Sequence, residues 1–351
     1  MSPDRISFED SLATAVIESG KCADCSACVV VCPFNCLDRV KGSPSLIKKC
    51  QTCGVCAQVC PKYEWSWAKM DTFVFGRART PDEEFGIYHK LAIAQAADDN
   101  ILKVCQDGGA VTALLSFALE KGFIDSAIVA GTIKERPFYP TSKLATTSED
   151  LWGAAGTKYS CAPTVLSLAD LSMQKKTKAA FVGTPCQVQA IRNMQMAGLK
   201  LVAPVKLVIG LMCSECFTYE GLMENHIRDK LSINLADVKK MNIKGKLLVT
   251  TDSGVTTVPL EDIKQYARKG CSLCDDFSSE LADISVGGLG LDSWTFTIIR
   301  TDKGEALFSE AEKARFLKTK TVDPRTRALK LLTKISKKKR KDATSSFQTR
   351  I

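Results

Sequence analysis

From about Phe85 onward, short apolar runs alternate with segments whose apolar residues recur at helical spacing. Four of the apolar runs have the length and composition of buried strands. These runs are residues 127–131, 179–183, 206–212 and 282–288. Because strands that alternate with helices are typical of α/β folds, we expect a large α/β domain here.

A helix is predicted directly after Gly109. Gly109 opens the segment, and Gly122 is the expected stop, because glycine accommodates the backbone conformation that ends many helices. The apolar side chains between them fall on one helical face, which would pack against the sheet. They are Val111, Leu114, Leu115, Ala118 and Leu119.

The first part of the chain has a different pattern, built on cysteine. Residues 22–33 read CADCSACVVVCP and residues 50–61 read CQTCGVCAQVCP, so the motif C-x2-C-x2-C-x3-C-P occurs twice. In this motif three cysteines bind one 4Fe-4S cluster, and the fourth, before proline, binds the other cluster. We therefore expect two 4Fe-4S clusters with exchanged ligands. The first would use Cys22, Cys25, Cys28 and Cys60, and the second would use Cys50, Cys53, Cys56 and Cys32.

Zinc binding and a disulfide scaffold are the alternatives for these repeats. Zinc sites favour separated C-x2-C pairs or histidine ligands, and disulfides are rare where thiols are kept reduced. Cys36 lies outside the repeat, and we expect it to be a packing residue. About 70 residues with two clusters would form a small ferredoxin-like α+β domain whose stability depends on its metal.

Length and composition favour two domains. The chain has 351 residues, of which 45% are hydrophobic and 25% charged, as in globular proteins, and it contains 16 cysteines. The first twenty residues lack the order of a signal peptide, and no apolar run approaches the ~18 residues that span a bilayer. We therefore expect a cytoplasmic protein without a membrane span of its own, which could associate with a membrane only through a partner.

Positive charge is concentrated at the carboxyl end. Residues 313–351 contain 14 Lys or Arg and 2 Asp, a net charge of +12, whereas the whole chain carries +9. We expect residues 316–351 to be a solvated, partly disordered basic tail, with docking to a partner or to anionic lipid as the alternative. Nucleic-acid binding is not expected, because no stacking aromatics or reading motif accompany the charge.

Further cysteines fall beside the predicted strands. Cys186 and Cys213 each follow a strand, and Cys271 and Cys274 form a C-x2-C ahead of another. Ligands collect at the carboxyl ends of strands in α/β sheets. These four thiols either converge on a third 4Fe-4S cluster or are buried packing residues. We expect packing roles for the other cysteines of this domain, which are Cys105, Cys161 and Cys216. Cys216 is also an alternative cluster ligand.

Turns that contain glycine offer candidate phosphate sites. Residues 106–112, 154–160 and 182–187 read QDGGAVT, AAGTKYS and VGTPCQ, and backbone N–H groups at such turns can approach an anion. None has the G-x-G-x-x-G context of a nicotinamide site. Lys158 and Arg192 are candidate partners for phosphate or carboxylate groups. With only two histidines, acid–base or triad chemistry has little support.

Several ordered motifs of the large domain resemble those of the beta subunit family of coenzyme F420-reducing hydrogenase. They are QDGGAVTALLSFALEKGFIDSAIVAG, AAGTKYS, FVGTPCQVQAIRNMQ, LVIGLMCSECFTYEGLM, CSLCDDFSSELADISVGG and IIRTDKGEALF. With the front domain added, the architecture is similar to the electron-input subunits of archaeal F420H2 dehydrogenases. We therefore expect a two-cluster domain over residues 1–70, a linker over 71–84, a flavin and iron–sulfur domain over 85–315, and the basic tail over 316–351.

This resemblance implies a flavin-dependent oxidoreductase. Members bind FAD, take hydride from reduced coenzyme F420 onto the flavin, and pass single electrons through clusters to other subunits of a redox complex, with a membrane-bound complex as one option. No catalytic side chain is implied, because the transfer is between cofactors. The implied flavin-proximal cluster uses Cys186, Cys213, Cys271 and Cys274. The implied FAD contacts are Gly108, Gly109, Gly156, Thr157, Lys158 and Thr184.

Two departures from the family pattern bear on the substrate. The loop after the last strand reads GLGLDSWTF, which keeps Trp294 but lacks the usual proline, and Cys216 replaces a residue that is not usually cysteine.

Three alternative functions remain open. They are a related beta subunit that works in the reverse direction, as in F420 reduction or a formate dehydrogenase, a relay subunit without flavin, and a flavin reductase of another conjugated ring.

Overall fold

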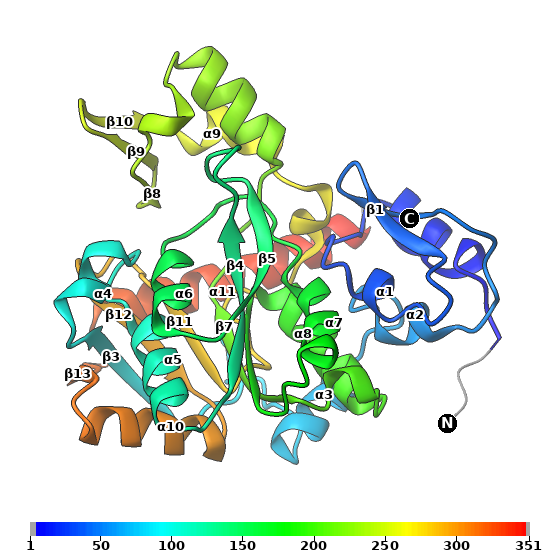
Figure 1. Ribbon diagram of the computed structural model, residues 1–351, viewed down its shortest axis with the longest axis horizontal. Helices are drawn as coiled ribbons and strands as arrows, with labels where there is room; N and C mark the ends of the chain where they lie inside the picture. The colour runs from blue at the N-terminus through cyan, green and yellow to red at the C-terminus, as the bar shows by residue number, and fades with distance from the viewer. Residues whose placement is uncertain (1–4, 349–351) are drawn as a thin grey trace.

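An eight-stranded mixed sheet forms the centre of the molecule in the computed structural model, which describes residues 5–348 (Figure 1). The strand order is β13-β3-β12-β11-β7-β6-β4-β5. Five strands run parallel, and β5, β12 and β13 run antiparallel to them. The strands are β3 (Lys90–Ala96), β4 (Ser126–Thr132), β5 (Pro140–Ala145), β6 (Ala179–Gly183), β7 (Val205–Leu211), β11 (Ile284–Gly287), β12 (Thr295–Ile299) and β13 (Leu317–Thr321).

The four strands expected from apolar runs are confirmed as β4, β6, β7 and β11. All five residues of β6 are buried, which is why its sequence is apolar throughout rather than alternating. The carboxyl ends of the five parallel strands meet at one edge of the sheet. The residues that follow β6 and β7, including Cys186 and Cys213, therefore lie at that edge.

Helices cover both faces of the sheet. The predicted helix is α5 (Ala110–Glu120), which packs with α10 (Asp302–Lys313) on one face. On the other face lie α8 (Pro185–Met196) and α11 (Arg327–Gln348). The shorter helices of this domain are α4 (Asp99–Val104), α6 (Ser148–Gly153), η2 (Thr164–Ser167), α7 (Leu168–Met173), η3 (Lys200–Val202) and η7 (Lys269–Leu273).

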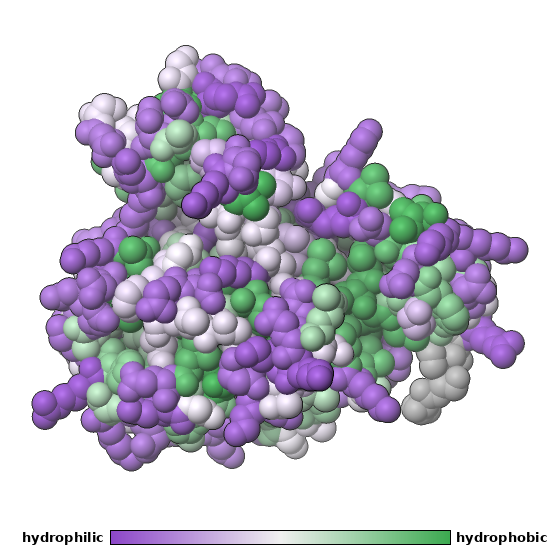
Figure 2. All heavy atoms as spheres, viewed as in Figure 1, coloured by the Kyte–Doolittle hydropathy of each residue, from purple (hydrophilic) through white to green (hydrophobic). Residues whose placement is uncertain are grey.

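A smaller unit with its own core stands above the sheet edge in Figure 1, and the sequence did not predict it. Its antiparallel sheet has the order β10-β9-β8. Figure 2 shows a hollow in the surface between this unit and the main body. The elements are η4 (Glu220–Lys230), η5 (Leu235–Asp237), β8 (Lys240–Ile243), β9 (Leu247–Thr251), β10 (Gly254–Val258), α9 (Leu260–Ile263) and η6 (Lys264–Tyr266).

The cysteine repeats form a small α+β unit at the side of the large domain. Its hairpin pairs β1 with β2, with Leu37 opposite Leu46. Val59 and Met70 are buried in one hydrophobic cluster with Val188 and Ile191 of α8, so the two units share a core. The elements are η1 (Glu9–Glu18), α1 (Ala27–Val30), β1 (Leu37–Val40), β2 (Ser43–Leu46), α2 (Val55–Val59) and α3 (Trp67–Phe75).

Two boundaries differ from the expectation. Helix α3 runs across the expected start of the linker, and Asp71 within it is fully buried against Arg79. The basic segment is not a solvated tail. Residues 317–321 add strand β13 to the sheet, and α11 crosses behind it with Leu332 fully buried. Within the described residues, none of the helices combines the length and apolarity needed to cross a bilayer.

Candidate functional site

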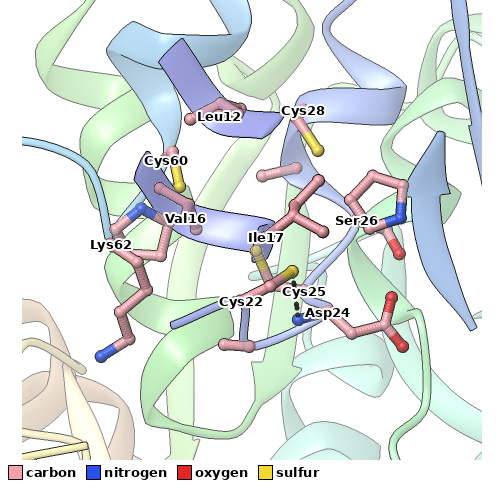
Figure 3. Close-up of a pocket in the computed structure, with 14 residues that line it drawn as sticks. Leu12, Val16, Ile17, Cys22, Asp24, Cys25, Ser26, Cys28, Cys60 and Lys62 are labelled. Atoms are coloured by element: carbon pink, nitrogen blue, oxygen red, sulfur yellow. Dashed lines mark hydrogen bonds between the residues drawn. The ribbon is translucent and has the colours of Figure 1, made fainter. Parts of the chain in front are cut away.

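The structure gathers the predicted first thiol set around one cavity. Cys22, Cys25, Cys28 and Cys60 line it together with Leu12 and Val16 of η1 (Figure 3). Cys60 comes from the second repeat, so the exchange of the fourth cysteine between repeats is present in the fold.

The second thiol set surrounds a separate cavity. Cys50, Cys53, Cys56 and the exchanged Cys32 line it. Cys36 lines the same cavity, but its thiol donates to the backbone oxygen of Lys49 at 3.2 Å. Among residues 5–348, no three His, Cys, Asp or Glu side chains are grouped as ligands of a single metal ion.

Both repeats fold their backbone in the same way. Asp24 and Thr52 occupy equivalent positions and have φ of 51° in each case. The next but one residues, Ser26 and Gly54, are also left-handed, with φ of 64° and 72°. This turn directs the Asp24 and Thr52 amides to Cys22 and Cys50, with N–Sγ distances of 3.4 Å. Hydrogen bonds of this kind stabilise sulfur that carries negative charge, as in iron–sulfur sites.

Burial disfavours ionisation of these thiols in the absence of a cation. It raises the pKa of Cys60 to about 12 and that of Cys56 to about 11. A coordinated metal reverses this preference, because it deprotonates its thiol ligands. Two cavities, each lined by the four thiols predicted for it, and amides directed at the sulfurs therefore fit clusters of iron and sulfide.

The third set lies where the sheet edge meets η7. Cys186 is in the first turn of α8, Cys213 follows β7, and Cys271 and Cys274 belong to η7 and the residue after it. Burial, followed by Cys213 and other neighbours, raises the pKa of Cys271 to about 12. Burial and Cys161 raise the pKa of Cys186, and Cys274 and Cys213 add to this effect. The four thiols are thus electrostatic neighbours, although they come from three separate segments.

The first and third thiol sets adjoin each other. Cys186 is an electrostatic neighbour of Cys25, whose pKa is raised by burial and then by Cys186. Gly270 packs so closely on the Cys22 carbonyl that an added Cβ would lie 2.4 Å from its oxygen. Cys161 also lies at this junction, with its thiol 3.8 Å from the Asp24 carbonyl oxygen.

Sequence reasoning assigned Cys216 mainly to packing, but it contacts the third set directly. Its amide donates to the Cys271 sulfur at 3.4 Å. Its thiol, and then Lys339, lower the pKa of Cys213 to about 7 despite burial. Cys216 is therefore a positioning residue for two members of the set. The signal that could have identified it is its place three residues after Cys213.

The first glycine turn is required mainly for packing. A Cβ on Gly108 would lie 2.6 Å from the Ala94 carbonyl oxygen, and its amide already donates to Thr295. Gly109 has φ of 73° and precedes α5, so its left-handed backbone starts the helix. The close approach of α5 to β3 and β12 explains both glycines.

The second turn presents a half-buried cation. Gly156 has φ of 82°, and the Thr157 amide donates to the Gln106 side chain at 3.1 Å. Among residues 5–348, the Lys158 ammonium donates only to backbone oxygens, which include those of Ala155 and Gly156 at 3.0 and 3.1 Å. Burial, with Lys143 nearby, lowers the pKa of Lys158 to about 8. A bound anion would relieve this unfavourable charge.

The two other candidate contacts have partners within the protein. Thr184 caps α8 in a reciprocal arrangement with Gln187, whose side-chain oxygen accepts from the Thr184 amide at 2.9 Å. Arg192 is buried and pairs with Asp283 at 3.0 Å, while its Nε donates to the Leu281 carbonyl at 2.8 Å. Arg192 therefore joins α8 to the segment before β11 and is not directed at a ligand.

Comparison with known proteins identifies the large domain. Residues 91–169 match the family described as the amino-terminal part of the coenzyme F420 hydrogenase/dehydrogenase beta subunit, and residues 176–325 match the family described as its carboxyl-terminal part. The chain belongs to the coenzyme F420 hydrogenase/dehydrogenase beta subunit family. The cysteines of the third set and the glycine turns all lie within these matched ranges.

Relatives in this family cover the chain to different extents. The beta subunit of the coenzyme F420 hydrogenase of Methanothermobacter thermautotrophicus is 40% identical over 76% of this chain and 96% of its own length. A subunit of the F420H2 dehydrogenase of Methanosarcina mazei is 32% identical over 95% of this chain and 93% of its own. A chain of the F420-reducing [NiFe] hydrogenase complex from Methanosarcina barkeri superimposes with a TM-score of 0.74 and 36% identity, over 78% of this chain and 95% of that one.

The loop that departs from the family pattern is strained and ordered. Leu289, Gly290 and Ser293 have left-handed φ of 46°, 75° and 58°. The Ser293 carbonyl accepts from Gln95 of β3 at 2.6 Å. Trp294 holds the Lys320 ammonium over its ring, 3.8 Å from the ring centre. The backbone of Trp294 also abuts Gly108, so this loop adjoins the first glycine turn.

Proposed function

We propose that this chain is an oxidoreductase that takes hydride from reduced coenzyme F420 onto FAD and passes single electrons through three 4Fe-4S clusters to partner subunits. The observation that carries the proposal is the succession of three four-thiol sets in a member of this family. Two sets line cavities of the N-terminal unit, and the third lies at the ligand-binding edge of the large sheet.

We assign the ligands of the three clusters to the three thiol sets. The first cavity would hold a cluster on the set that includes Cys22, the second on the set that includes Cys50, and the sheet edge on the set that includes Cys186. A 4Fe-4S cluster supplies one-electron transfer, with a potential set by nearby charge, hydrogen bonds and solvent exposure. The protein supplies amide donors to the sulfurs, from Asp24, Thr52 and Cys216.

The order of the relay follows from which sets adjoin. The third set neighbours the first through Cys186 and Cys25. The first and second sets are interleaved, because each repeat gives its fourth cysteine to the other cavity. Electrons that enter at the sheet edge would therefore pass to the first cluster and leave from the second, next to the exposed side chain of Phe34.

The flavin would be held at the turns that follow α4 and α6. FAD supplies the exchange between hydride and single electrons when bound. Lys158 would place its ammonium against the anionic pyrophosphate, because it has only carbonyl oxygens as partners within the described residues. The amides of the Gly109 and Gly156 turns would face the same ligand, while Thr184 would orient Cys186 through the 3.4 Å contact of its hydroxyl with that sulfur.

The front domain favours electron input over the reverse reaction. The dehydrogenase relative from Methanosarcina mazei aligns with 95% of this chain, whereas the hydrogenase relative from Methanothermobacter thermautotrophicus aligns with 76% although 96% of its own length is covered. We propose partner subunits of a redox complex as acceptors, with membrane association only through that complex.

Anaerobic, reconstituted protein tests the function directly. Iron, sulfide and flavin are measured per chain, and the oxidation of reduced F420 is then followed with a one-electron dye as acceptor. About twelve iron atoms and one FAD per chain, with F420 oxidation, are expected. Bound FAD without F420 oxidation would reject the substrate, and a colourless supernatant after denaturation would favour a relay without flavin.

A further inference from the structure

The carboxyl-terminal helix α11 passes beside the third thiol set. It packs against η7, which carries Cys271. Ala328 and Leu332 fix the start of the helix by packing in one cluster with Phe277 and Phe296. Figure 1 shows α11 behind the sheet, running toward the N-terminal unit. The basic helix is thus an integral part of the large domain.

Three of its basic residues are fixed by different partners. Lys337 pairs with Glu84, and Arg340 donates to both carboxylate oxygens of Glu280 at 2.7 Å. Between them, the Lys339 ammonium donates to the Cys213 carbonyl oxygen at 2.7 Å. Lys338, next to it in sequence, is exposed. The two flanking ion pairs therefore set the position of Lys339.

The positive charge of Lys339 faces sulfur rather than carboxylate. Burial lowers its pKa, but Cys274, Cys213 and Cys271 outweigh this and bring the pKa above its ordinary range. Within residues 5–348, Lys339 forms no salt bridge with a carboxylate. Its charge is thus directed at three members of the third thiol set.

A second ammonium approaches the same set from the N-terminal unit. Lys62 lines the first cavity, yet Figure 3 shows its side chain leading away from the four thiols there. Burial lowers the pKa of Lys62, but its neighbours Cys274, Asp275 and Cys186 outweigh this effect and raise it. Lysines from the two ends of the chain therefore converge on one group of thiols.

We propose that Lys339, with Lys62, raises the reduction potential of the 4Fe-4S cluster held by the third set. The proposal rests on the proposed function for the presence of that cluster. A cluster with four thiolates is anionic and gains one further negative charge when it accepts one electron. A fixed positive charge nearby stabilises the reduced form more than the oxidised form. The basic helix α11 thus makes the entry point of the relay a better electron acceptor.

Potentiometric titration of the anaerobic, reconstituted full chain tests this inference. The third cluster is identified as the electron paramagnetic resonance signal that is lost in C271S. Its midpoint potential is then compared between the wild type, K339M, the charge-retaining K339R, and the matched control K338M. We expect K339M to lower the reduced-to-oxidised ratio of this cluster at a fixed potential by about tenfold, which is 59 mV for one electron. K339R and K338M should titrate like the wild type.

Each outcome decides the proposal. An unchanged potential in K339M overturns it, while the wild-type signal keeps the proposed function intact. A wild type without a third signal overturns both. If K339M fails to retain the cluster, K62M provides the same test from the other side, and an unchanged or higher potential there rejects the proposal. The signal of the second cluster serves as the internal reference in both tests, since Lys62 lines the first cavity.

Discussion

At the level of single residues, the cysteine repeats predict which cysteines bind a cluster and which only pack beside it. Cys53 and Cys36 line the same cavity, but only Cys53 belongs to the motif, and the Cys36 thiol donates to a backbone oxygen. We expect C53S to lower the iron content from about twelve to about eight atoms per chain, because one cluster is lost. C36S should retain about twelve. Iron and sulfide assays on anaerobic protein measure this, and equal losses in both variants would contradict the ligand assignment.

The pKa of Lys158 predicts how flavin binding depends on pH. Its folded-state pKa of about 8 lies below the unfolded value of about 10.4, so its charged form is disfavoured by folding and stability falls as pH drops through that window. An anion at this site binds best to the charged form. FAD affinity of the wild type should therefore be constant below pH 8 and decline above it, by up to about tenfold per pH unit.

Fluorescence titration of the apoprotein with FAD between pH 6.5 and 9.5 measures this dependence. K158M should bind FAD more weakly at pH 7 and lose the dependence on pH. K121M provides the control, because Lys121 is exposed and pairs with Glu120. A wild-type affinity that stays constant up to pH 9.5 would exclude Lys158 from the flavin site.

The sequence predicted the role of a residue where a motif repeats, but not where the role depends on a packing partner far along the chain. The spacing of the repeats predicted which thiols line each of the two cavities, including the exchanged Cys32 and Cys60, and their role as cluster ligands stays a prediction. The role of Arg192 could not be read, since its partner Asp283 lies far along the chain. The ligand role of the third set remains a prediction, although the fold brings its four thiols together.

At the level of elements, Arg192 ties α8 to the sheet. Its side chain and that of Asp283 are buried, and removing this cation leaves the carboxylate with the half-exposed Lys303 as its cationic partner among the described residues. We expect R192M to cost about 3–5 kcal/mol of stability and to lower the apparent unfolding temperature of the anaerobic protein. The exposed pair of Arg228 and Asp229 makes R228M the control, with little change expected. Loss of FAD from folded R192M without loss of stability would instead support a role in binding.

Elements were predicted where burial alone determines the sequence pattern. The strands β4, β6, β7 and β11 are recognisable because both of their faces are covered. Helix α11 was missed because its charge dominated its composition. Its buried positions Ala328, Leu332, Ser336 and Ala343 nevertheless follow helical spacing, and Lys339 lies on the same stripe. A basic segment with such a stripe is better predicted as a docked helix than as a tail.

At the scale of the whole molecule, the relay depends on contact between the two units. Asp24, between two cysteines of the first set, is fully buried. It accepts from Arg39 of the same unit at 3.0 Å and from Arg268, which precedes η7 of the large domain. Because η7 also carries Cys271, this one carboxylate fixes the first thiol set relative to the third.

Replacing that carboxylate should loosen the two units without removing a cluster ligand. D24N leaves two largely buried arginines without their anion, a change that costs about 3–5 kcal/mol when a buried pair is broken. We expect faster amide hydrogen exchange around residues 22–28 and 268–274. We also expect slower reduction of the first and second clusters after mixing with reduced F420, with an unchanged iron content. D38N is the control, because Asp38 is exposed on β1 and accepts from the Arg39 amide. If D24N exchanged and reduced like the wild type, the ion pair would not govern electron transfer between the units, and the shared core around Val59 and Met70 would have to hold them in register alone.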